Sequence, residues 1–343
     1  MPDQGRCATI VEASSLTPRL ECCSVIRFLF SLFVSLGCFT AVAAQPLVTP
    51  AELAARLGDS KLRIVDIREG QENKVGGKSA YDLGHIAGAQ HAPYSKWRGP
   101  TENPGQLPAL DSLTALIQQL GIDQTTPVVV VYEGKDSTDF GSAARVYWTL
   151  KTAGVATLSV LNGGMTAWRA AGLPLSTEAT ETAARAPSSF QITLDSRLIA
   201  TRDEVAQVVG NRSARLLDAR PATYFAGEER HAAAKTPGTI VGAKNVSHDV
   251  WFSKEGRLLP RDDIKRIAQQ AGVVTDQPTI SFCNTGHWAA TTWFVLSELL
   301  GQDNVKLYPE SVVEWSNAGL AMDNVPNRLQ QFWLQLKVAS GAP

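Results

Sequence analysis

The chain has 343 residues, of which 32 are basic and 33 are acidic, and its formal net charge is −1. This balance excludes a polybasic nucleic-acid-binding protein and an acidic tail protein. Because 44% of the residues are hydrophobic and 19% are charged, the chain can form a buried core and is not disordered as a whole. At roughly 100–200 residues per domain, this length predicts two domains.

Residues 1–44 are typical of a secretory signal peptide. An uncharged apolar run at residues 28–44 follows two arginines and ends in small residues, which predicts cleavage after Ala43 or Ala44. The alternative is an uncleaved membrane anchor, for which the run is slightly short. We therefore expect an exported, periplasmic protein that has no stable membrane association after cleavage.

Removal of this segment leaves one of the five cysteines, Cys283. The other four lie in the removed part: Cys7, Cys22, Cys23 and Cys38. A single cysteine in an exported chain indicates an intermolecular disulfide, a reactive thiol or a small buried hydrophobic residue.

The rest of the chain contains one pattern twice. The matching segments are residues 63–68 with 215–220, residues 84–89 with 238–243, and residues 127–132 with 278–283. A period this long indicates duplicated domains and not a solenoid, whose repeats have about 20–50 residues. We expect domains at 46–176 and 196–324, a linker at 177–195 and a tail at 325–343.

Each copy is predicted to alternate strands and helices. Apolar runs bounded by Gly, Pro or Asp predict strands at 63–67, 128–132 and 158–161. Capping residues and terminal glycines predict helices at 53–57, 111–120, 142–152, 201–209 and 289–300, and a short tail helix is predicted at 328–338. This order predicts an α/β fold in which each domain has a mostly parallel sheet with helices on both faces.

Cys283 stands between a predicted strand and a short loop that leads into the helix at 289–300. Ligands bind at the carboxyl ends of strands in such sheets, and the free N–H groups and dipole of a helix start stabilise an anion. Both effects favour the thiolate, the nucleophilic form of cysteine. The alternative is an inert buried cysteine. A metal site is disfavoured because one cysteine and scattered histidines give no ligand spacing.

Taken together, these features resemble the tandem-domain rhodaneses, the thiosulfate sulfurtransferase family. The resemblance covers residues 46–324 and rests on these segments: 66–68, 84–89, 168, 218–220, 238–243, 283–288 and 308–315. It implies a non-catalytic first domain, a catalytic second domain and an active site near their interface. It also implies that Cys283 takes sulfur from a donor such as thiosulfate, becomes a persulfide, and passes the sulfur to cyanide or a thiol without a cofactor.

The persulfide charge is expected to be held by backbone N–H groups of the loop. These belong to Asn284, Thr285, Gly286, His287, Trp288 and Ala289. Many family members have Arg or Lys in this loop and a substrate-binding Arg where this chain has Tyr224. Substrate contacts and positive charge are therefore sought in Tyr224 and in Arg220, Lys235, Lys244 and His287, the last as a hydrogen-bond donor or a cation.

Each of these candidates has a structural alternative. Arg220 pairs with Asp218 in a motif that recurs without a cysteine as Asp66 and Arg68, so it is also explained as an ion pair. The lysines are also explained as solvated surface residues, and His287 as a loop residue without chemistry. Trp288 is expected to form a wall of the pocket.

Two other functions stay open. The nearest is a 3-mercaptopyruvate sulfurtransferase, and the other is a non-catalytic sulfur carrier or anion-binding module. A cysteine phosphatase of related fold is excluded, because it needs a bidentate arginine at the position of Ala289. The expected partners are a small-molecule sulfur donor and acceptor.

Overall fold

The computed structural model describes residues 45–69, 77–178, 186–327 and 329–330, and these belong to one compact unit, Ala43–Pro343. The predicted signal peptide at 1–44 and most of the predicted tail helix at 328–338 lie outside the described residues. Within the described part of the chain, no helix combines the length and the apolar character needed to cross a bilayer.

The first domain is built on a five-stranded parallel sheet of order β1-β5-β4-β2-β3. Its strands are β1 (Leu47–Val48), β2 (Arg63–Asp66), β3 (Ala89–His91), β4 (Val128–Val131) and β5 (Leu158–Leu161). Its helices are α1 (Pro50–Ala54), α2 (Ala80–Leu83), the 3₁₀ turn η1 (Tyr94–Trp97), α3 (Leu110–Gln119), α4 (Ser137–Thr152) and α5 (Gly164–Ala170). The three predicted strands are confirmed.

The second domain repeats this plan with a four-stranded parallel sheet of order β10-β9-β6-β8 and a separate antiparallel pair, β11-β7. Its strands are β6 (Arg215–Asp218), β7 (Thr239–Ile240), β8 (Lys244–Asn245), β9 (Thr279–Phe282), β10 (Val305–Leu307) and β11 (Met322–Asp323). Its helices are α6 (Arg202–Asn211), α7 (Ala222–Phe225), the 3₁₀ turn η3 (His248–Trp251), α8 (Arg261–Gln270), α9 (Trp288–Phe294), the π turn η4 (Val295–Leu299) and α10 (Ser311–Asn317).

Local capping explains where several helices begin. Thr49 caps α1 in a capping box with Glu52, as predicted. Helix α4 begins at Ser137, before the predicted start at 142, because Asp136 accepts a hydrogen bond from the Asp139 N–H and caps it there. The predicted helix at 289–300 ends its α-helical part at Phe294 and continues as the π turn η4.

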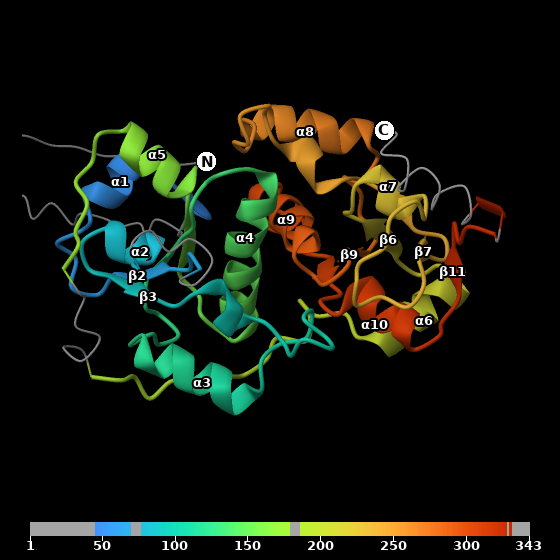
Figure 1. Cartoon of the computed structure of the whole chain (residues 1–343), viewed down its shortest axis with the longest axis horizontal. Coiled ribbons are helices and arrows are strands. Elements are labelled where there is room, and N and C mark those ends of the chain that lie inside the picture. The colour runs from blue at the N-terminus through green and yellow to red at the C-terminus, as the bar shows by residue number, and fades with distance from the viewer. Residues whose placement is uncertain (1–44, 70–76, 179–185, 328, 331–343) are drawn as a thin grey trace, which may run out of the picture. The chain divides into compact units, whose positions relative to one another are not determined.

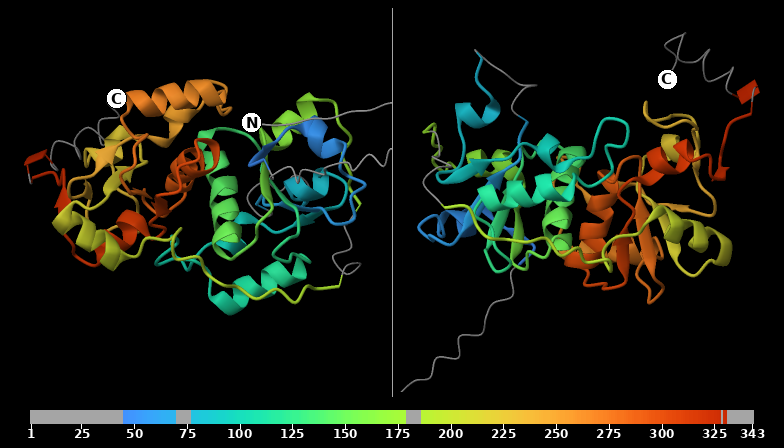
Figure 2. Two further views of the ribbon diagram at one scale, coloured as in Figure 1. Left: turned by 180° about the vertical axis from the view of Figure 1, so that it is seen from behind. Right: turned by 90° about the horizontal axis from the view of Figure 1, so that it is seen from below.

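Both faces of each sheet are buried, which confirms the predicted fold. Along β2, Ile64 packs with residues of α1, α2 and α5, whereas Val65 packs on the opposite face, as the two-residue period of a strand requires. The core around Val65 is continuous with that of the second domain and includes Phe140 of α4 and Trp293 of α9. Helices α4 and α9 lie side by side (Figures 1 and 2), so the two domains share one core.

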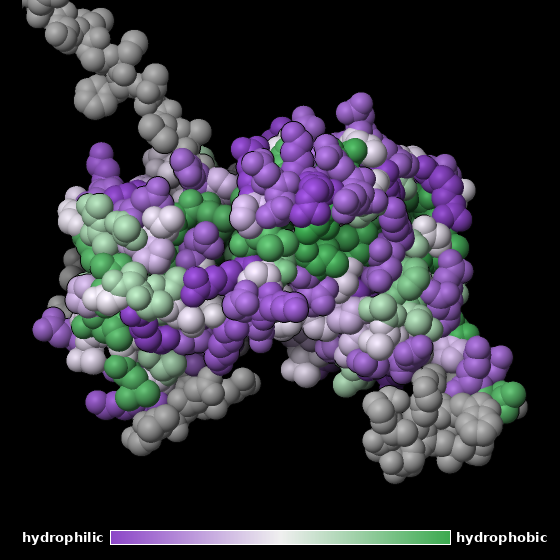
Figure 3. Space-filling model, turned by 90° about the horizontal axis from the view of Figure 1, so that it is seen from above, coloured by the Kyte–Doolittle hydropathy of each residue, from purple (hydrophilic) through white to green (hydrophobic). Residues whose placement is uncertain are grey.

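Helix α8 on the outer surface also has a buried and an exposed face. Helix α8, with sequence RDDIKRIAQQ, buries Ile264 and Ala268. Seen from the side on which α8 lies, hydrophilic residues alternate with hydrophobic areas (Figure 3). Because α4 follows β4 and α9 follows β9 in the chain, the carboxyl ends of the two parallel sheets lie near this pair of packed helices.

Candidate active site

Cys283 directly follows β9, at the carboxyl end of the second sheet, and it is a free thiol that is 1% exposed. Its N–H donates to Ser311 Oγ (3.0 Å), and its carbonyl accepts from the Val312 N–H (3.1 Å). Ser311 itself has a φ of 56° and donates to the Tyr308 carbonyl (2.7 Å). A serine at positive φ is strained, so this hydroxyl holds Cys283 at the expense of backbone strain.

In the Cys283 loop, residues 283–288, the backbone carbonyls of residues 284–286 are bonded, whereas the N–H groups that follow Cys283 have no acceptor among the described residues. The carbonyls of Asn284, Thr285 and Gly286 accept from the Val313 N–H (3.1 Å), Arg98 Nη2 (2.9 Å) and Arg145 Nη1 (3.4 Å), respectively. No described residue accepts a hydrogen bond from the backbone N–H groups of residues 284–289. Because N–H and C=O point in opposite directions across a trans peptide, the bonded carbonyls turn the next N–H groups away from these partners.

This arrangement is the one that the sequence predicts for an anion-binding loop. Free N–H donors beside a thiol stabilise negative charge at the start of a helix. Gly286 allows the turn, with a φ of 69°, and a Cβ atom there would lie 2.4 Å from both Arg145 Nη1 and the Pro309 carbonyl oxygen. That these donors hold a persulfide stays a prediction.

Arg220 braces the loop and is not a free substrate-binding cation. It is 1% exposed, and its Nε donates to both carboxylate oxygens of Asp218 (2.9 and 3.1 Å). Its Nη2 donates to the Gly238 carbonyl (2.7 Å), and its Nη1 donates to Asn284 Oδ1 (3.2 Å). The first domain repeats this brace with Arg68, Asp66 and Glu133. The geometry therefore supports the ion-pair interpretation of Arg220.

Among the described residues, no hydrogen bond or ion pair joins either candidate lysine to the Cys283 loop. Lys235 is exposed, and its backbone N–H donates to Ser316 Oγ (3.1 Å). Lys244 is exposed on β8, and its Nζ donates to the carbonyl of Ala271, the C-cap of α8. A cation near a helix C-terminus is stabilised by the helix dipole, so Lys244 has a structural role here, and its contact with substrate stays a prediction.

Tyr224 and Trp288 form an aromatic wall. The Trp288 ring stacks on His248 with centroids 4.9 Å apart, and Tyr224 meets it edge-on at 5.9 Å. The Trp288 Nε1 donates to Thr138 Oγ1 of the first domain (3.2 Å). Tyr224 is half-buried, and burial raises its pKa, so it offers a neutral hydroxyl where a substrate-binding arginine was sought.

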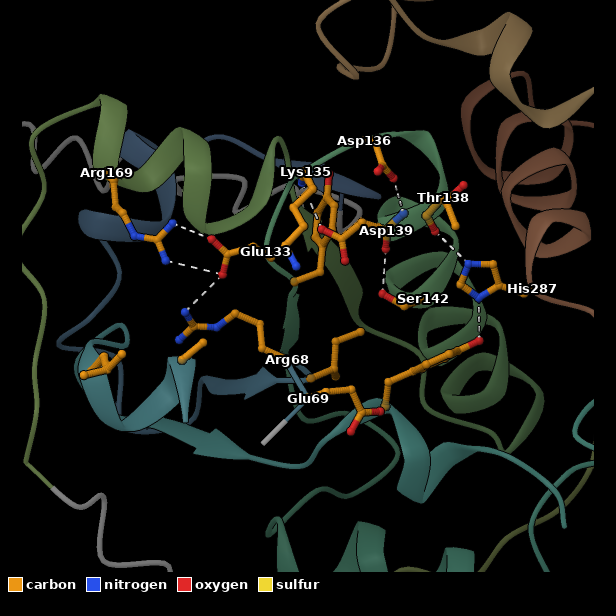
Figure 4. A pocket seen from close by; sticks show the side chains of 15 residues that line it. Arg68, Glu69, Glu133, Lys135, Asp136, Thr138, Asp139, Ser142, Arg169 and His287 are labelled. Atoms are coloured by element: carbon orange, nitrogen blue, oxygen red, sulfur yellow. Dashed lines mark hydrogen bonds and ion pairs between the residues drawn. The ribbon is translucent and has the colours of Figure 1, made fainter. Parts of the chain in front are cut away.

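Both ring nitrogens of His287 are bonded to the first domain (Figure 4). Its Nε2 lies 2.7 Å from the Thr138 carbonyl, which can only accept, so Nε2 carries the proton and Nδ1 accepts from the Tyr94 hydroxyl (2.8 Å). Burial, reinforced by the charge of Arg98, lowers the pKa of His287 to about 3. Burial therefore favours a neutral His287 whose ring nitrogens both bond first-domain groups, and a role of His287 toward the donor molecule stays a prediction.

Four first-domain residues complete the site and were not predicted. They are Tyr94, Arg98, Thr138 and Arg145, whose contacts with the Cys283 loop are given above. One sequence signal pointed to them, because Arg145 interrupts the apolar run Ala143-Ala144-Arg145-Val146 in α4. An arginine in such a run is exceptional unless it has a partner.

The equivalent place in the first domain is hollow and lacks a thiol. Tyr132 stands where Cys283 does, and its carbonyl accepts from the Met165 N–H (2.9 Å), as that of Cys283 does from Val312. A cavity of about 580 Å³ lies there, bordered by Tyr132 and His287 among others (Figure 4). In it, Glu133 bonds Arg169 (2.6 Å) and Arg68 (3.3 Å), so these charged groups satisfy one another.

Comparisons with known proteins agree with this geometry. A family model, the rhodanese-like domain, matches residues 49–171 and 201–318. The thiosulfate sulfurtransferase of Azotobacter vinelandii is 32% identical over 277 residues, which cover 80% of this chain and 96% of that protein. The thiosulfate sulfurtransferase of Pseudomonas aeruginosa is 31% identical over 271 residues, which cover 79% of this chain and 93% of that protein.

Solved structures show the same fold. SseA from Escherichia coli, described as a 3-mercaptopyruvate sulfotransferase, is 29% identical with a TM-score of 0.66 and matches 78% of this chain and 99% of its own. The 3-mercaptopyruvate sulfurtransferase of Leishmania major is 25% identical with a TM-score of 0.66 and matches 80% of this chain and 75% of its own. The chain therefore belongs to the rhodanese family and contains two rhodanese-like domains.

Proposed function

We propose that this rhodanese-family sulfurtransferase uses thiosulfate as its sulfur donor and carries the sulfur as a persulfide on Cys283. The observation that supports this most is the set of free backbone N–H groups at residues 284–289, in the loop that Cys283 begins. Two relatives that match about four fifths of the chain are thiosulfate sulfurtransferases by name. The acceptor is cyanide or a thiol.

The reaction proceeds in two displacements. The Cys283 thiolate attacks the outer sulfur of thiosulfate, so a new S–S bond forms while the S–S bond of thiosulfate breaks and sulfite leaves with the electron pair. Cyanide then attacks the outer persulfide sulfur, a C–S bond forms in thiocyanate, and the Cys283 thiolate leaves. The loop donors stabilise the negative charge in both forms. Because Cys283 is 1% exposed, neighbouring side chains must move to admit the donor.

The test compares thiosulfate:cyanide transfer by the wild type and Cys283→Ser, with intact-mass analysis after thiosulfate alone. We expect the wild type to gain the mass of one sulfur atom and Cys283→Ser to lose both the adduct and turnover. Tyr132→Phe, at the equivalent position of the first domain, is the matched control and should keep activity. Full activity in Cys283→Ser would overturn the mechanism, and an inactive wild type would favour a non-catalytic sulfur-binding module.

A second candidate donor is 3-mercaptopyruvate, which the structural similarity to the Escherichia coli and Leishmania major proteins favours. Here Cys283 attacks the thiol sulfur, the C–S bond breaks, and pyruvate leaves as its enolate and takes up the proton from the thiol. Measuring sulfite released from thiosulfate and pyruvate released from 3-mercaptopyruvate gives kcat/KM for each donor. A larger value for 3-mercaptopyruvate would replace our first assignment.

We also propose that the protein is exported to the periplasm after cleavage of the segment at 1–44. The support is the sequence pattern alone, namely the apolar run at 28–44 and its small-residue end. Mass analysis of protein from a periplasmic extract should find an N-terminus at Ala44 or Gln45. Recovery of the uncleaved chain from the membrane fraction would contradict this.

A further inference from the structure

We propose that Arg98 and Arg145, two cations of the first domain, supply the positive charge on which the Cys283 loop depends. This inference rests on the proposed function, since it concerns the same thiol. The loop itself contains no Lys or Arg, and both nitrogens of His287 are bonded elsewhere. The first domain would then be part of the active centre and not only a scaffold.

Arg145 is a buried cation that has no ion-pair partner among the described residues. Its side chain is 0% exposed, its Nη2 donates to the Gly105 carbonyl (2.7 Å), and its Nε has no hydrogen-bond partner in the described part of the chain. The guanidinium carbon lies 5.0 Å from the centre of the Trp148 ring. Burial lowers the pKa of Arg145 to about 9, which still leaves it charged at neutral pH.

A buried charge without a counterion is unfavourable, so an anion in the site would compensate it. Glu310 is the acidic side chain whose charge acts on Arg145, but burial raises the pKa of Glu310, and among the described residues no ion pair joins the two. Tyr94 and the Cys283 sulfur are the other groups whose negative charge would act on Arg145, but burial raises the pKa of Tyr94, which stays protonated at neutral pH. Because Arg145 also bonds the Gly286 carbonyl of the Cys283 loop (3.4 Å), we infer that the thiolate or persulfide of Cys283 is its counterion.

Arg98 and Arg145 also act through two consecutive peptide groups of the loop. Arg98 Nη2 bonds the Thr285 carbonyl (2.9 Å), and Arg145 Nη1 bonds the Gly286 carbonyl at a longer 3.4 Å. A cation on the oxygen of a peptide group polarises it and makes its N–H a stronger donor. The N–H groups affected belong to Gly286 and His287, which have no acceptor among the described residues.

The other charged or titratable groups facing this loop do not provide the same charge. Arg220 is paired with Asp218, and burial lowers the pKa of His248 and His287. Burial also raises the pKa of Tyr94, so these three side chains are neutral at pH 7. Arg98 and Arg145 are therefore the groups that supply positive charge to the Cys283 loop.

The test is the pH dependence of iodoacetamide alkylation at Cys283, measured by peptide mass analysis on the full chain. Arg98→Met and Arg145→Met should shift the rate–pH profile to higher pH by about one unit and slow alkylation at neutral pH roughly tenfold. Arg145→Lys, which keeps the charge, should restore part of the rate. A merely structural role would change stability or KM without moving this profile.

Lys151→Met is the matched control. Lys151 lies on the same helix, α4, and its Nζ contacts Glu298 of the second domain at 2.7 Å, so this variant removes an inter-domain cation away from the loop. Its profile should coincide with that of the wild type. If Arg145→Met does not fold by circular dichroism, the half-buried Arg98 provides the deciding variant.

The outcomes separate this inference from the proposed function. Coincident profiles for the wild type, Arg98→Met and the folded Arg145→Met would overturn the inference even if thiosulfate turnover were normal. Conversely, a wild type without turnover but with shifted variant profiles would refute the proposed function and leave the charge assignment standing.

Discussion

Gly286→Ala tests whether the loop must approach Arg145 of the first domain and Pro309 without a side chain. Gly286 has a φ of 69°, and the added Cβ would lie 2.4 Å from Arg145 Nη1 and 2.4 Å from the Pro309 carbonyl oxygen. The left-handed conformation costs an L-residue about 1–2 kcal/mol. Since Pro309 contributes a backbone atom, it cannot rotate away as a side chain can, and the loop must shift.

This shift should reduce catalysis more than stability. A displacement on the order of 1 Å near reacting groups costs about 100-fold in rate, so we expect kcat/KM for thiosulfate:cyanide transfer to fall about 100-fold. The control is Gly301→Ala, because Gly301 has a φ of 75° but no atom within 4 Å of the added Cβ. It should lose about 1–2 kcal/mol of unfolding free energy in urea and keep its activity. Equal activity in the two variants would refute this reasoning.

Two further predictions concern the supports of the loop. Ser311→Ala removes the acceptor of the Cys283 N–H and should cost about 1–3 kcal/mol of unfolding free energy. Ser311→Gly removes the same acceptor but also relieves the strain at φ 56°, so its urea midpoint should be higher than that of Ser311→Ala. The reverse order of the two midpoints would count against strain at this residue. The pKa of His287 is lowered to about 3, so the unfolded chain binds more protons below pH 6.5, and stability falls as the pH drops from 6.5 towards 3. Between pH 7 and pH 5, His287→Gln should reduce this loss by at most about 2 kcal/mol, because each pH unit below 6.5 contributes about 1.4 kcal/mol and solvent screening of the ring lowers the effect further. Urea unfolding at the two pH values measures it, and an unchanged pH dependence would refute a buried neutral His287.

The sequence was sufficient for the fold because its signals are local. The Thr49 capping box, the apolar run at Val128–Val131 and the strand–loop–helix order around Cys283 involve neighbouring residues, and their backbone preferences need no partner from elsewhere. The duplication could also be predicted from the sequence, because each copy repeats the same local segments in the same order. The π turn after Phe294 was missed because α-helix and π turn share one residue pattern and differ through packing.

The site was predicted only in part. Position alone identified Cys283 and its loop, because a residue at the end of a parallel strand and before a helix start faces the ligand-binding edge of a sheet. The candidate cations Arg220, Lys244 and His287 were chosen from the second domain, and each turned out to have structural partners. Their residue types suited substrate binding, but no local pattern states which partner a long side chain takes.

What the sequence determined by itself was therefore a pair of α/β domains with one thiol at a strand end. Tertiary structure alone decided that first-domain residues hold the loop of the second. Tyr94 and His287 are separated by 193 positions in the chain, and Arg98 and Thr285 by 187. Contacts at such separations arise when α4 and α9 pack into one core, and neither segment carries a pattern that records the other.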